Sequence, residues 1–296
     1  MHRITRSTTL ALCGVLLAAT TACGSNDAPG SASKNGSAYG DCEVSGKRGE
    51  FKLTPATAGA LTVETNLPAP GWWNGDTPQT VKSGYEYCMA ANIAHRAGLD
   101  RVNVKNVSFD ALVAGKTKDF DLALLEITIT EERKKVVDFS PPYFSADQGV
   151  LVKAGSKVDA RSIRDARIGV SLGTTGALFV QEQLKPSHPA KVFQSNQDMV
   201  AALAAGQVDA VVADASILLA QAKQTGGVLK VVGQYDTGET YGALYPKGSA
   251  NRATLDRIIR QMAADGTLDR LARTHLAEAF GTDPTKVPHF TLGAAS

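Results

Sequence analysis

The sequence predicts an α/β protein built from two similar lobes. Two stretches share one pattern, residues 109–126 (FDALVAGKTKDFDLALLE) and 197–214 (QDMVAALAAGQVDAVVAD). Each holds an apolar-periodic helix, a glycine stop, a polar turn, an aspartate and a short apolar run that suits a buried strand. A helix followed by a buried strand, seen twice, indicates two α/β units, with chance similarity as the alternative. The final acids, Glu126 and Asp214, are expected at equivalent strand tips, one in each lobe.

The first of these strands leads directly into a charged helix start. The apolar run 122–125 ends at Glu126, and Thr130 is a good N-cap for a helix with two acids in its first turn. Arg133 then lies within one turn of that helix start, beside a strand tip. A guanidinium next to free backbone N–H groups suits a small carboxylate. Ligands of open α/β sheets bind at the carboxyl ends of strands, so this segment is a candidate site.

The second lobe has its own strand, turn and helix. Residues 168–171 favour a strand, residues 172–176 (LGTTG) a tight polar loop, and residues 177–184 a helix. The N–H groups at this helix start, with the hydroxyls of Thr174 and Thr175, form another predicted anion site. The GK[ST] element of a nucleotide-binding P-loop is absent from the sequence.

The same turn also matches a hydrolase pattern. Residues 169–173 (GVSLG) fit GxSxG, which would make Ser171 a nucleophile. No HGGG-like oxyanion element precedes it, and the acid and histidine partners would have to be chosen arbitrarily. A binding turn is therefore the favoured interpretation.

Charge and composition exclude some classes of protein. The chain has 296 residues, 43% hydrophobic and 20% charged, as in ordinary globular proteins. Its net charge of +2 comes from Arg3 and Arg6, without which 29 basic residues balance 29 acidic ones (31 − 2 = 29). Nucleic-acid binding has no electrostatic support.

The N-terminal segment is typical of an exported protein. Two arginines precede an apolar run, residues 10–19, that is too short to span a bilayer. The following TTACGS resembles the lipobox of bacterial lipoproteins, in which Cys23 receives a diacylglyceryl group, although Thr20 stands where leucine is usual. Two acyl chains would hold the protein at a membrane surface, and residues 24–40 have the composition of a flexible tether. The alternative is ordinary secretion with cleavage elsewhere.

The remaining cysteines favour a disulfide. Cys13 lies in the apolar signal core and Cys23 is the lipidation candidate, which leaves Cys42 and Cys88. Two such cysteines in an exported protein favour a disulfide, with two independent thiols as the alternative. The five histidines show no metal-ligand spacing and no CxxC is present, so we expect no metal site and no cofactor.

These motifs resemble the family 3 bacterial solute-binding proteins, the extracytoplasmic receptors of polar amino-acid ABC importers. The resemblance runs from about Leu61 to Leu276, and the segment ITITEERKKVVDFSPPYF carries it most specifically, followed by VSLGTTG, VDAVVAD and DGTLDRL in the expected order. It implies a two-lobed, periplasmic-binding-protein-like clamshell with a mixed, mostly parallel sheet in each lobe. Two hinge crossings are expected near residues 147–153 and 240–246.

That architecture gives five expected regions. They are the signal peptide 1–22, the anchor and linker 23–47, the first segment of lobe 1 at 48–147, lobe 2 at 148–241, and the return to lobe 1 with a tail at 242–296.

The resemblance also implies roles for the ligand-binding residues. Arg133 would bind a ligand α-carboxylate with help from Thr128 and Thr175, and Asp214 would receive the α-ammonium. Aromatic walls would come from Phe109 and from the tryptophan pair after the first strand. The full expected set is Arg133, Thr128, Glu126, Thr175, Thr174, Asp214, Asn66, Trp72, Trp73 and Phe109. Alternatives are an internal partner for Arg133, helix capping by Asp214, and plain packing of the tryptophans.

Three departures from the family bear on the ligand. Glu126 stands where glycine, alanine or serine is usual, Asn66 replaces a frequent aspartate, and the loop 67–82 is longer and richer in tryptophan and proline. Our hypothesis is that Glu126 binds a second positive or donor-rich group, with cation–π contact from Trp72 or Trp73. This favours a basic or amine-rich amino compound. The alternative is an internally neutralised Glu126 and a neutral polar ligand.

We therefore expect a monomeric binding receptor without catalytic activity. It would be lipid-anchored to the outer face of the cytoplasmic membrane, close on a small amino compound, and deliver it to an ABC permease. One rival is a cyclohexadienyl dehydratase-like enzyme on the same fold, with Glu126 as general acid. Another is a sensor that reports its ligand to a signalling partner.

Overall fold

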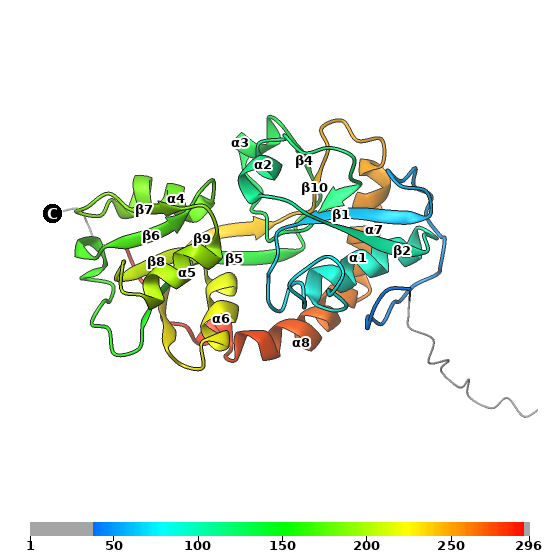
Figure 1. Cartoon of the computed structure of the whole chain (residues 1–296). Coiled ribbons are helices and arrows are strands. Elements are labelled where there is room, and N and C mark those ends of the chain that lie inside the picture. The colour runs from blue at the N-terminus through cyan, green and yellow to red at the C-terminus, as the bar shows by residue number, and fades with distance from the viewer. Residues whose placement is uncertain (1–37, 293–296) are drawn as a thin grey trace, which may run out of the picture. The chain divides into compact units, whose positions relative to one another are not determined.

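Two five-stranded sheets, each flanked by helices, organise the computed structural model, which describes residues 38–292 (Figure 1). The predicted signal peptide, Cys23 and most of the tether lie outside the described residues, so those expectations stay predictions. No helix within residues 38–292 is long and apolar enough to cross a membrane.

The sheet of lobe 1 has the order β2-β1-β3-β10-β4. Strand β1 pairs in parallel with β2 and β3, whereas β10 runs antiparallel to β3 and β4. The strands are β1 (Ala60–Thr65), β2 (Arg101–Asn106), β3 (Leu122–Ala123), β4 (Asp138–Phe139) and β10 (Leu244–Tyr245). Because β10 follows all the strands of lobe 2 in the sequence, the sheet of lobe 1 is completed by a segment to which the chain returns after it has passed through lobe 2.

The sheet of lobe 2 has the order β7-β6-β8-β5-β9. Strand β6 pairs in parallel with β7 and β8, and β5 pairs antiparallel with β8 and β9. The strands are β5 (Phe144–Lys153), β6 (Ile168–Ser171), β7 (Lys191–Phe193), β8 (Ala210–Asp214) and β9 (Leu229–Tyr241). In each lobe, the predicted repeat forms a helix followed by a buried strand with a parallel neighbour.

Helices flank these sheets, and α3, α4 and α5 each begin at a threonine or serine whose hydroxyl caps the first turn. The α-helices are α1 (Tyr85–Arg96), α2 (Phe109–Val113), α3 (Glu131–Lys134), α4 (Thr175–Phe179), α5 (Asn196–Ala204), α6 (Ala215–Gln224), α7 (Arg252–Ala264) and α8 (Thr267–Phe280). A π-helical turn, η2 (Val180–Leu184), continues α4, and two short 3₁₀ turns are η1 (Ile163–Asp165) and η3 (Pro284–Lys286). The predicted N-cap is confirmed, since the Thr130 hydroxyl accepts the N–H of Arg133 at 3.1 Å.

Strands β5 and β9 carry the chain between the lobes. They pair from Phe144 opposite Tyr241 to Lys153 opposite Leu229, with bulges on the way. Lobe 1 joins this ribbon through the N–H of Gly242, which donates to the carbonyl of Ile127 at 3.0 Å. The chain thus enters the sheet of lobe 2 with β5 and leaves it at the end of β9, and the expected crossings near residues 147–153 and 240–246 fall within or next to these strands.

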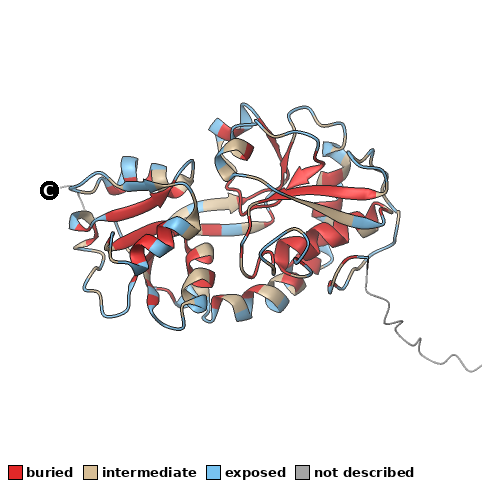
Figure 2. Ribbon diagram, in the orientation of Figure 1, coloured by how far each residue is buried: buried red, intermediate tan, exposed pale blue. Residues whose placement is uncertain are grey.

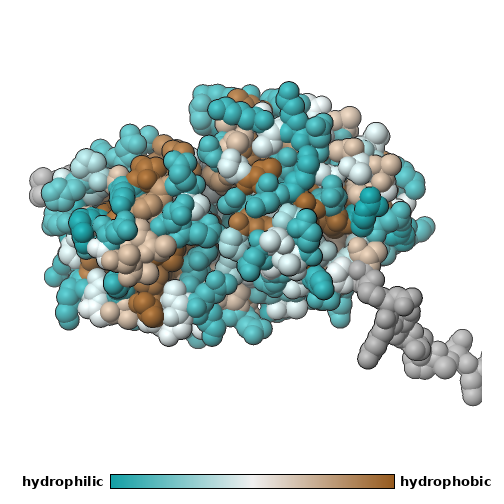
Figure 3. All heavy atoms as spheres, viewed as in Figure 1, coloured by the Kyte–Doolittle hydropathy of each residue, from teal (hydrophilic) through white to brown (hydrophobic). Residues whose placement is uncertain are grey.

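Burial follows the position of each strand in its sheet (Figure 2). Every residue of the central strands β1 and β8 is buried, whereas edge strand β2 is half-buried or exposed throughout. Central parallel strands are covered on both faces, which explains the short continuous apolar runs in the sequence. Most of the surface visible in Figure 3 is hydrophilic, with apolar residues in scattered patches.

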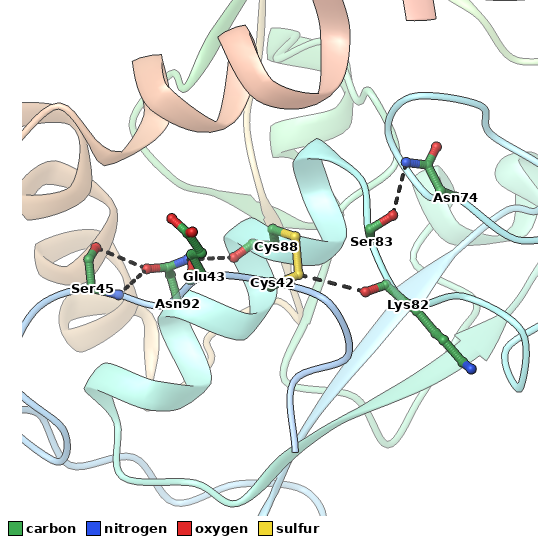
Figure 4. The surroundings of a disulfide bond; sticks show 8 residues. All are labelled: Cys42, Glu43, Ser45, Asn74, Lys82, Ser83, Cys88 and Asn92. Carbon is green, nitrogen blue, oxygen red and sulfur yellow. Dashed lines mark hydrogen bonds between the residues drawn. A yellow bond between two sulfur atoms is a disulfide. The ribbon is translucent and has the colours of Figure 1, made fainter. Parts of the chain in front are cut away.

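A disulfide joins Cys42 to Cys88 in α1, which confirms the predicted pairing (Figure 4). The same segment is held by Asn92, whose amide oxygen accepts from the N–H of Ser45 at 2.9 Å. The Asn92 amide nitrogen donates to the carbonyl oxygens of Cys88 and Glu43. The first described residues are therefore fastened to lobe 1 covalently and through hydrogen bonds.

The end of the chain returns to lobe 2, a contact that the sequence did not predict. The N–H of Phe290 donates to the carbonyl of Gln234 in β9 at 2.7 Å, and the Phe290 ring meets Tyr235 edge to face. Helix α7 packs on α1 of lobe 1, α8 packs on both α1 of lobe 1 and α6 of lobe 2, and the tail packs on lobe 2, so the last described part of the chain links both lobes.

Candidate functional site

A cavity lined by both lobes brings together nearly all the predicted site residues. Lobe 1 contributes Asn66, Trp72, Phe109, Glu126, Thr128 and Arg133, and lobe 2 contributes Ser171, Thr174, Thr175 and Asp214. Free space between the lining atoms totals about 760 Å³ including solvent at the mouth, which is within the range of small-molecule sites.

Arg133 is the only cationic side chain that lines this cavity among residues 38–292. Its position follows from the Thr130 cap, which starts α3 just after the strand tip. The buried guanidinium donates from Nη1 to the Thr128 carbonyl at 2.6 Å and from Nη2 to the Gly173 carbonyl at 3.0 Å. It also lies 5.3 Å from the centre of the Phe109 ring, within cation–π range. Arg133 therefore contacts both lobes at the cavity.

Burial lowers the pKa of the Arg133 guanidinium from its ordinary value, while the carboxylates of Asp214 and Glu239 act in the opposite direction. Within the described chain, no carboxylate comes within ion-pair distance of Arg133. A buried cation satisfied only by carbonyl oxygens is a favourable place for an anion that brings its own charge.

Glu126 lies three residues beyond the end of β3 and is held in an unusual backbone conformation. Its φ is +46°, in the left-handed region that favours glycine. Its Oε1 is buried and has no hydrogen-bond partner within the described residues. Strained backbone and an unsatisfied carboxyl oxygen are costly, and such features concentrate at functional sites.

A second buried acid, Glu86 of α1, hydrogen-bonds the backbone of Glu126. Its Oε1 accepts from the Glu126 N–H at 2.9 Å and from the Tyr143 hydroxyl, and its Oε2 accepts from the Trp73 indole at 2.8 Å. Burial raises the pKa of Glu86 to about 7, although these hydrogen bonds act to lower it. Burial, followed by the charges of Glu86 and Asp214, raises the pKa of Glu126 well above its usual value. A positive group beside this pair would favour ionisation.

Asp214 ends β8 and faces the cavity from lobe 2. It occupies the N-cap position of α6, but its side chain makes no capping bond. It accepts instead from the Gln148 amide and the Tyr241 hydroxyl, each at 2.7 Å. Burial, with a contribution from Glu239, raises the pKa of Asp214 to about 6, while Arg133 acts against the rise.

The lobe 2 turn forms as the sequence predicts. Thr174 caps α4, because its hydroxyl accepts the Ala177 N–H at 3.1 Å. The Thr175 hydroxyl reaches across to Glu239 in β9. Gly176 packs against Gln148 so closely that an added Cβ would lie 2.7 Å from its amide oxygen. Ser171 lines the cavity, yet no histidine or acid of the described chain hydrogen-bonds its hydroxyl, so the hydrolase triad is not assembled.

The two tryptophans are placed differently. Trp72 lines the cavity and stacks edge-on against Tyr85, Phe144 and Tyr241. Trp73 is fully buried in lobe 1, packs on Tyr87 and does not line the cavity.

Asn66 lies at the cavity edge and donates to the carbonyl of Val107 at 2.7 Å, which ties the end of β1 to the neighbouring loop. Sequence reasoning missed Glu86, Gln148, Tyr241 and Glu239, since their role depends on contacts between distant segments.

Comparison with known proteins identifies the family. Residues 62–278 match the bacterial extracellular solute-binding proteins, family 3. The chain belongs to this family. It is 27% identical over 209 residues to the L-cystine-binding protein TcyJ of Escherichia coli (strain K12), an alignment that covers 69% of this chain and 76% of TcyJ. It is 33% identical to the ABC transporter glutamine-binding protein GlnH of Bacillus subtilis (strain 168), over 54% of this chain and 59% of that one.

A solved structure agrees with this assignment. An ancestral arginine-binding protein bound to arginine has a TM-score of 0.65 and 33% identity, and the match covers 73% of this chain and 98% of that one. The two-lobed α/β fold that the sequence predicts is confirmed.

Proposed function

We propose that this protein is the substrate-binding receptor of an ABC importer and takes up an amino acid that carries a second positive or donor-rich group. The observation that carries this proposal is the charge pattern of the cavity. One buried cation, Arg133 of lobe 1, shares it with the carboxyls of Glu126 in lobe 1 and Asp214 in lobe 2. A zwitterion needs one fixed cation and one fixed anion, and the further acid leaves room for one more positive group.

The α-carboxylate of the ligand would bind Arg133 through parallel charge-assisted hydrogen bonds, with the hydroxyls of Thr128 and Thr175 as further donors. Asp214 would accept the α-ammonium. Since these groups come from two lobes, a ligand that binds all of them stabilises the closed arrangement.

Glu126 would receive the second positive group of the ligand, and Trp72 would provide an apolar wall beside it. The cystine, glutamine and arginine named for the relatives each carry a second nitrogen-containing group. The alternative is a neutral polar ligand, because the raised pKa of Glu126 favours a protonated, neutral carboxyl at this position.

The receptor would act outside the cytoplasmic membrane as a monomer. Lipidation of Cys23 and the following tether would keep the lobes near the permease to which ligand is delivered.

A thermal-shift screen of the purified protein against amino acids, polyamines and guanidino compounds tests this function. We expect the largest shifts from α-amino acids with a second amino, guanidino or amide group. A protein that responds to none of them is not such a receptor. Product analysis after incubation with prephenate-like substrates separates binding from the dehydratase alternative, and any turnover would contradict the receptor proposal.

A further inference from the structure

Glu239, near the end of β9, holds its carboxylate between the two lobes. Its Oε2 accepts from the Thr128 hydroxyl of lobe 1 at 3.0 Å and from the Thr175 hydroxyl of lobe 2 at 2.7 Å. The Gln148 amide nitrogen lies 3.3 Å from both carboxylate oxygens. This carboxylate is half-buried and belongs to the strand that carries the chain back to lobe 1.

These contacts coincide with those assigned above to a ligand carboxylate. Thr128 and Thr175 both line the cavity, and the charge of Glu239 acts on the nearby Arg133. Glu239 itself does not line the cavity but approaches the two hydroxyls from the hinge side. An internal carboxylate thus makes hydrogen bonds that a bound amino acid would need.

Glu239 and a ligand carboxylate cannot both receive these hydrogen bonds. A threonine hydroxyl has a single proton and donates one hydrogen bond, so a hydroxyl that serves Glu239 has none to give a ligand. Two carboxylates that meet at the same pair of hydroxyls also repel each other in surroundings of low dielectric.

We propose that Glu239 is an internal competitor for the carboxylate subsite, which a ligand α-carboxylate must displace from Thr128 and Thr175 before it binds. This inference rests on the proposed function. It makes Glu239 a specificity-determining residue: affinity for the carboxylate end of a ligand is lowered, and binding depends more on the positive groups that Asp214 and Glu126 receive. Ligands with a second carboxylate are expected to bind most weakly, because they bring more negative charge to an acidic site.

The test uses the variants Glu239→Ala and Glu239→Gln, with Asp236→Asn as the matched control. Asp236 is an exposed acid on the same strand, so the control removes one negative charge without touching the hydroxyls. Glu239→Ala removes the competing acceptor, whereas Glu239→Gln keeps its shape and one acceptor oxygen but removes its charge. Affinities for L-arginine and for agmatine, which lacks the carboxylate, are measured by calorimetry.

We expect Glu239→Ala to raise the ratio of arginine affinity to agmatine affinity about tenfold, which is the size of one charge-assisted hydrogen bond released to the ligand. Glu239→Gln should raise this ratio less, and Asp236→Asn should leave it unchanged. The ratio cancels the general attraction between an acidic site and a cation, which both probes share.

An unchanged or lowered ratio in Glu239→Ala, with wild-type protein that binds arginine, overturns this inference and leaves the receptor function intact. If wild type and all variants fail to bind arginine, lysine, histidine, glutamine and cystine, the proposed function fails and the inference fails with it. Binding that appears only in Glu239→Ala supports the inference.

Discussion

Arg133 is the side chain on which we expect ligand binding to depend most. Its guanidinium is buried beside the cavity and forms no ion pair with a carboxylate of the described chain. We predict that Arg133→Ala weakens binding of any α-amino acid by about 2–5 kcal/mol, roughly thirtyfold or more, because a desolvated charge pair is lost. Calorimetric titration measures this loss.

The control for that experiment is Lys134→Ala, which removes a neighbouring, partly exposed cation that pairs with Glu131 on the surface. It should bind as tightly as wild type. Arg133→Ala with near wild-type affinity would show that the carboxylate binds elsewhere.

Glu126 is the residue that we expect to determine which amino acid fits. We predict that Glu126→Gln weakens arginine or lysine at least about tenfold and changes glutamine affinity less than about threefold, since an amide keeps the shape but loses the charge that pairs with a cation. A ligand panel measured by thermal shift and calorimetry checks this. Equal changes for cationic and neutral ligands would assign Glu126 an internal role only.

Sequence reasoning reached Arg133 and Asp214 because each follows a short local pattern of strand tip, cap and helix start. It could not reach Glu86 or Glu239, because their importance comes from segments that meet only in the fold. Glu86 sits on a mostly buried helix face and Glu239 in a polar stretch of a hinge strand. The Trp72–Trp73 pair shows another limit: neighbouring side chains diverge, and only packing decides which one reaches the cavity.

Elements with strong local signals formed as predicted, and the weaker ones shifted. The repeat predicted the pairs α2–β3 and α5–β8, yet β3 has only two residues because the chain turns sharply before Glu126. The hinge strands β5 and β9 are longer than their apolar patterns indicate. Their antiparallel pairing continues beyond the buried residues into half-buried and exposed ones.

The disulfide that fastens the first described residues to α1 makes a separate prediction. It closes a loop with a sequence separation of 46 residues, which on the loop-entropy account contributes about 4 kcal/mol. The double variant Cys42→Ser/Cys88→Ser should lose about 3–4 kcal/mol of unfolding free energy in denaturant titration. A reductant should lower wild type to the level of the variant and leave the variant unchanged; equal stability of both proteins without reductant would contradict this account.

At the scale of the whole molecule, the buried acids couple stability to pH. The folded-state pKa of Glu86 is raised to about 7 and that of Asp214 to about 6, and that of Glu126 is also raised. The folded protein therefore binds more protons than the unfolded chain between about pH 4 and pH 7, so stability falls as pH rises through this window. His275, whose pKa burial lowers, acts in the opposite direction near its ordinary value.

We predict that the ligand-free protein is more stable at pH 5 than at pH 7.5 by about 1–3 kcal/mol. Carboxyls with lowered pKa, such as Asp138 and Asp209, lose their contribution only at lower pH and do not change this sign. Denaturant titrations at several pH values measure the slope, and Glu126→Gln should flatten it. Stability that rises steadily from pH 5 to pH 7.5 would show that these acids are ionised in the folded protein.

Two lobes could be predicted from the repeat and two hinge crossings from the family resemblance, but a third connection between the lobes could not. The tail that returns from α8 to β9 depends on Phe290 meeting Tyr235 across the fold, and no periodic pattern in the sequence marks that contact. Its effect is to join the lobes by a third segment besides the two hinge strands.

The most direct test of this account is a crystal structure of the protein with its tightest-binding amino acid. We predict that the ligand carboxylate lies within hydrogen-bond distance of the Arg133 guanidinium and that its α-ammonium contacts Asp214, with Glu239 moved away from Thr175. A ligand bound outside the cavity, or one that contacts only a single lobe, would contradict it.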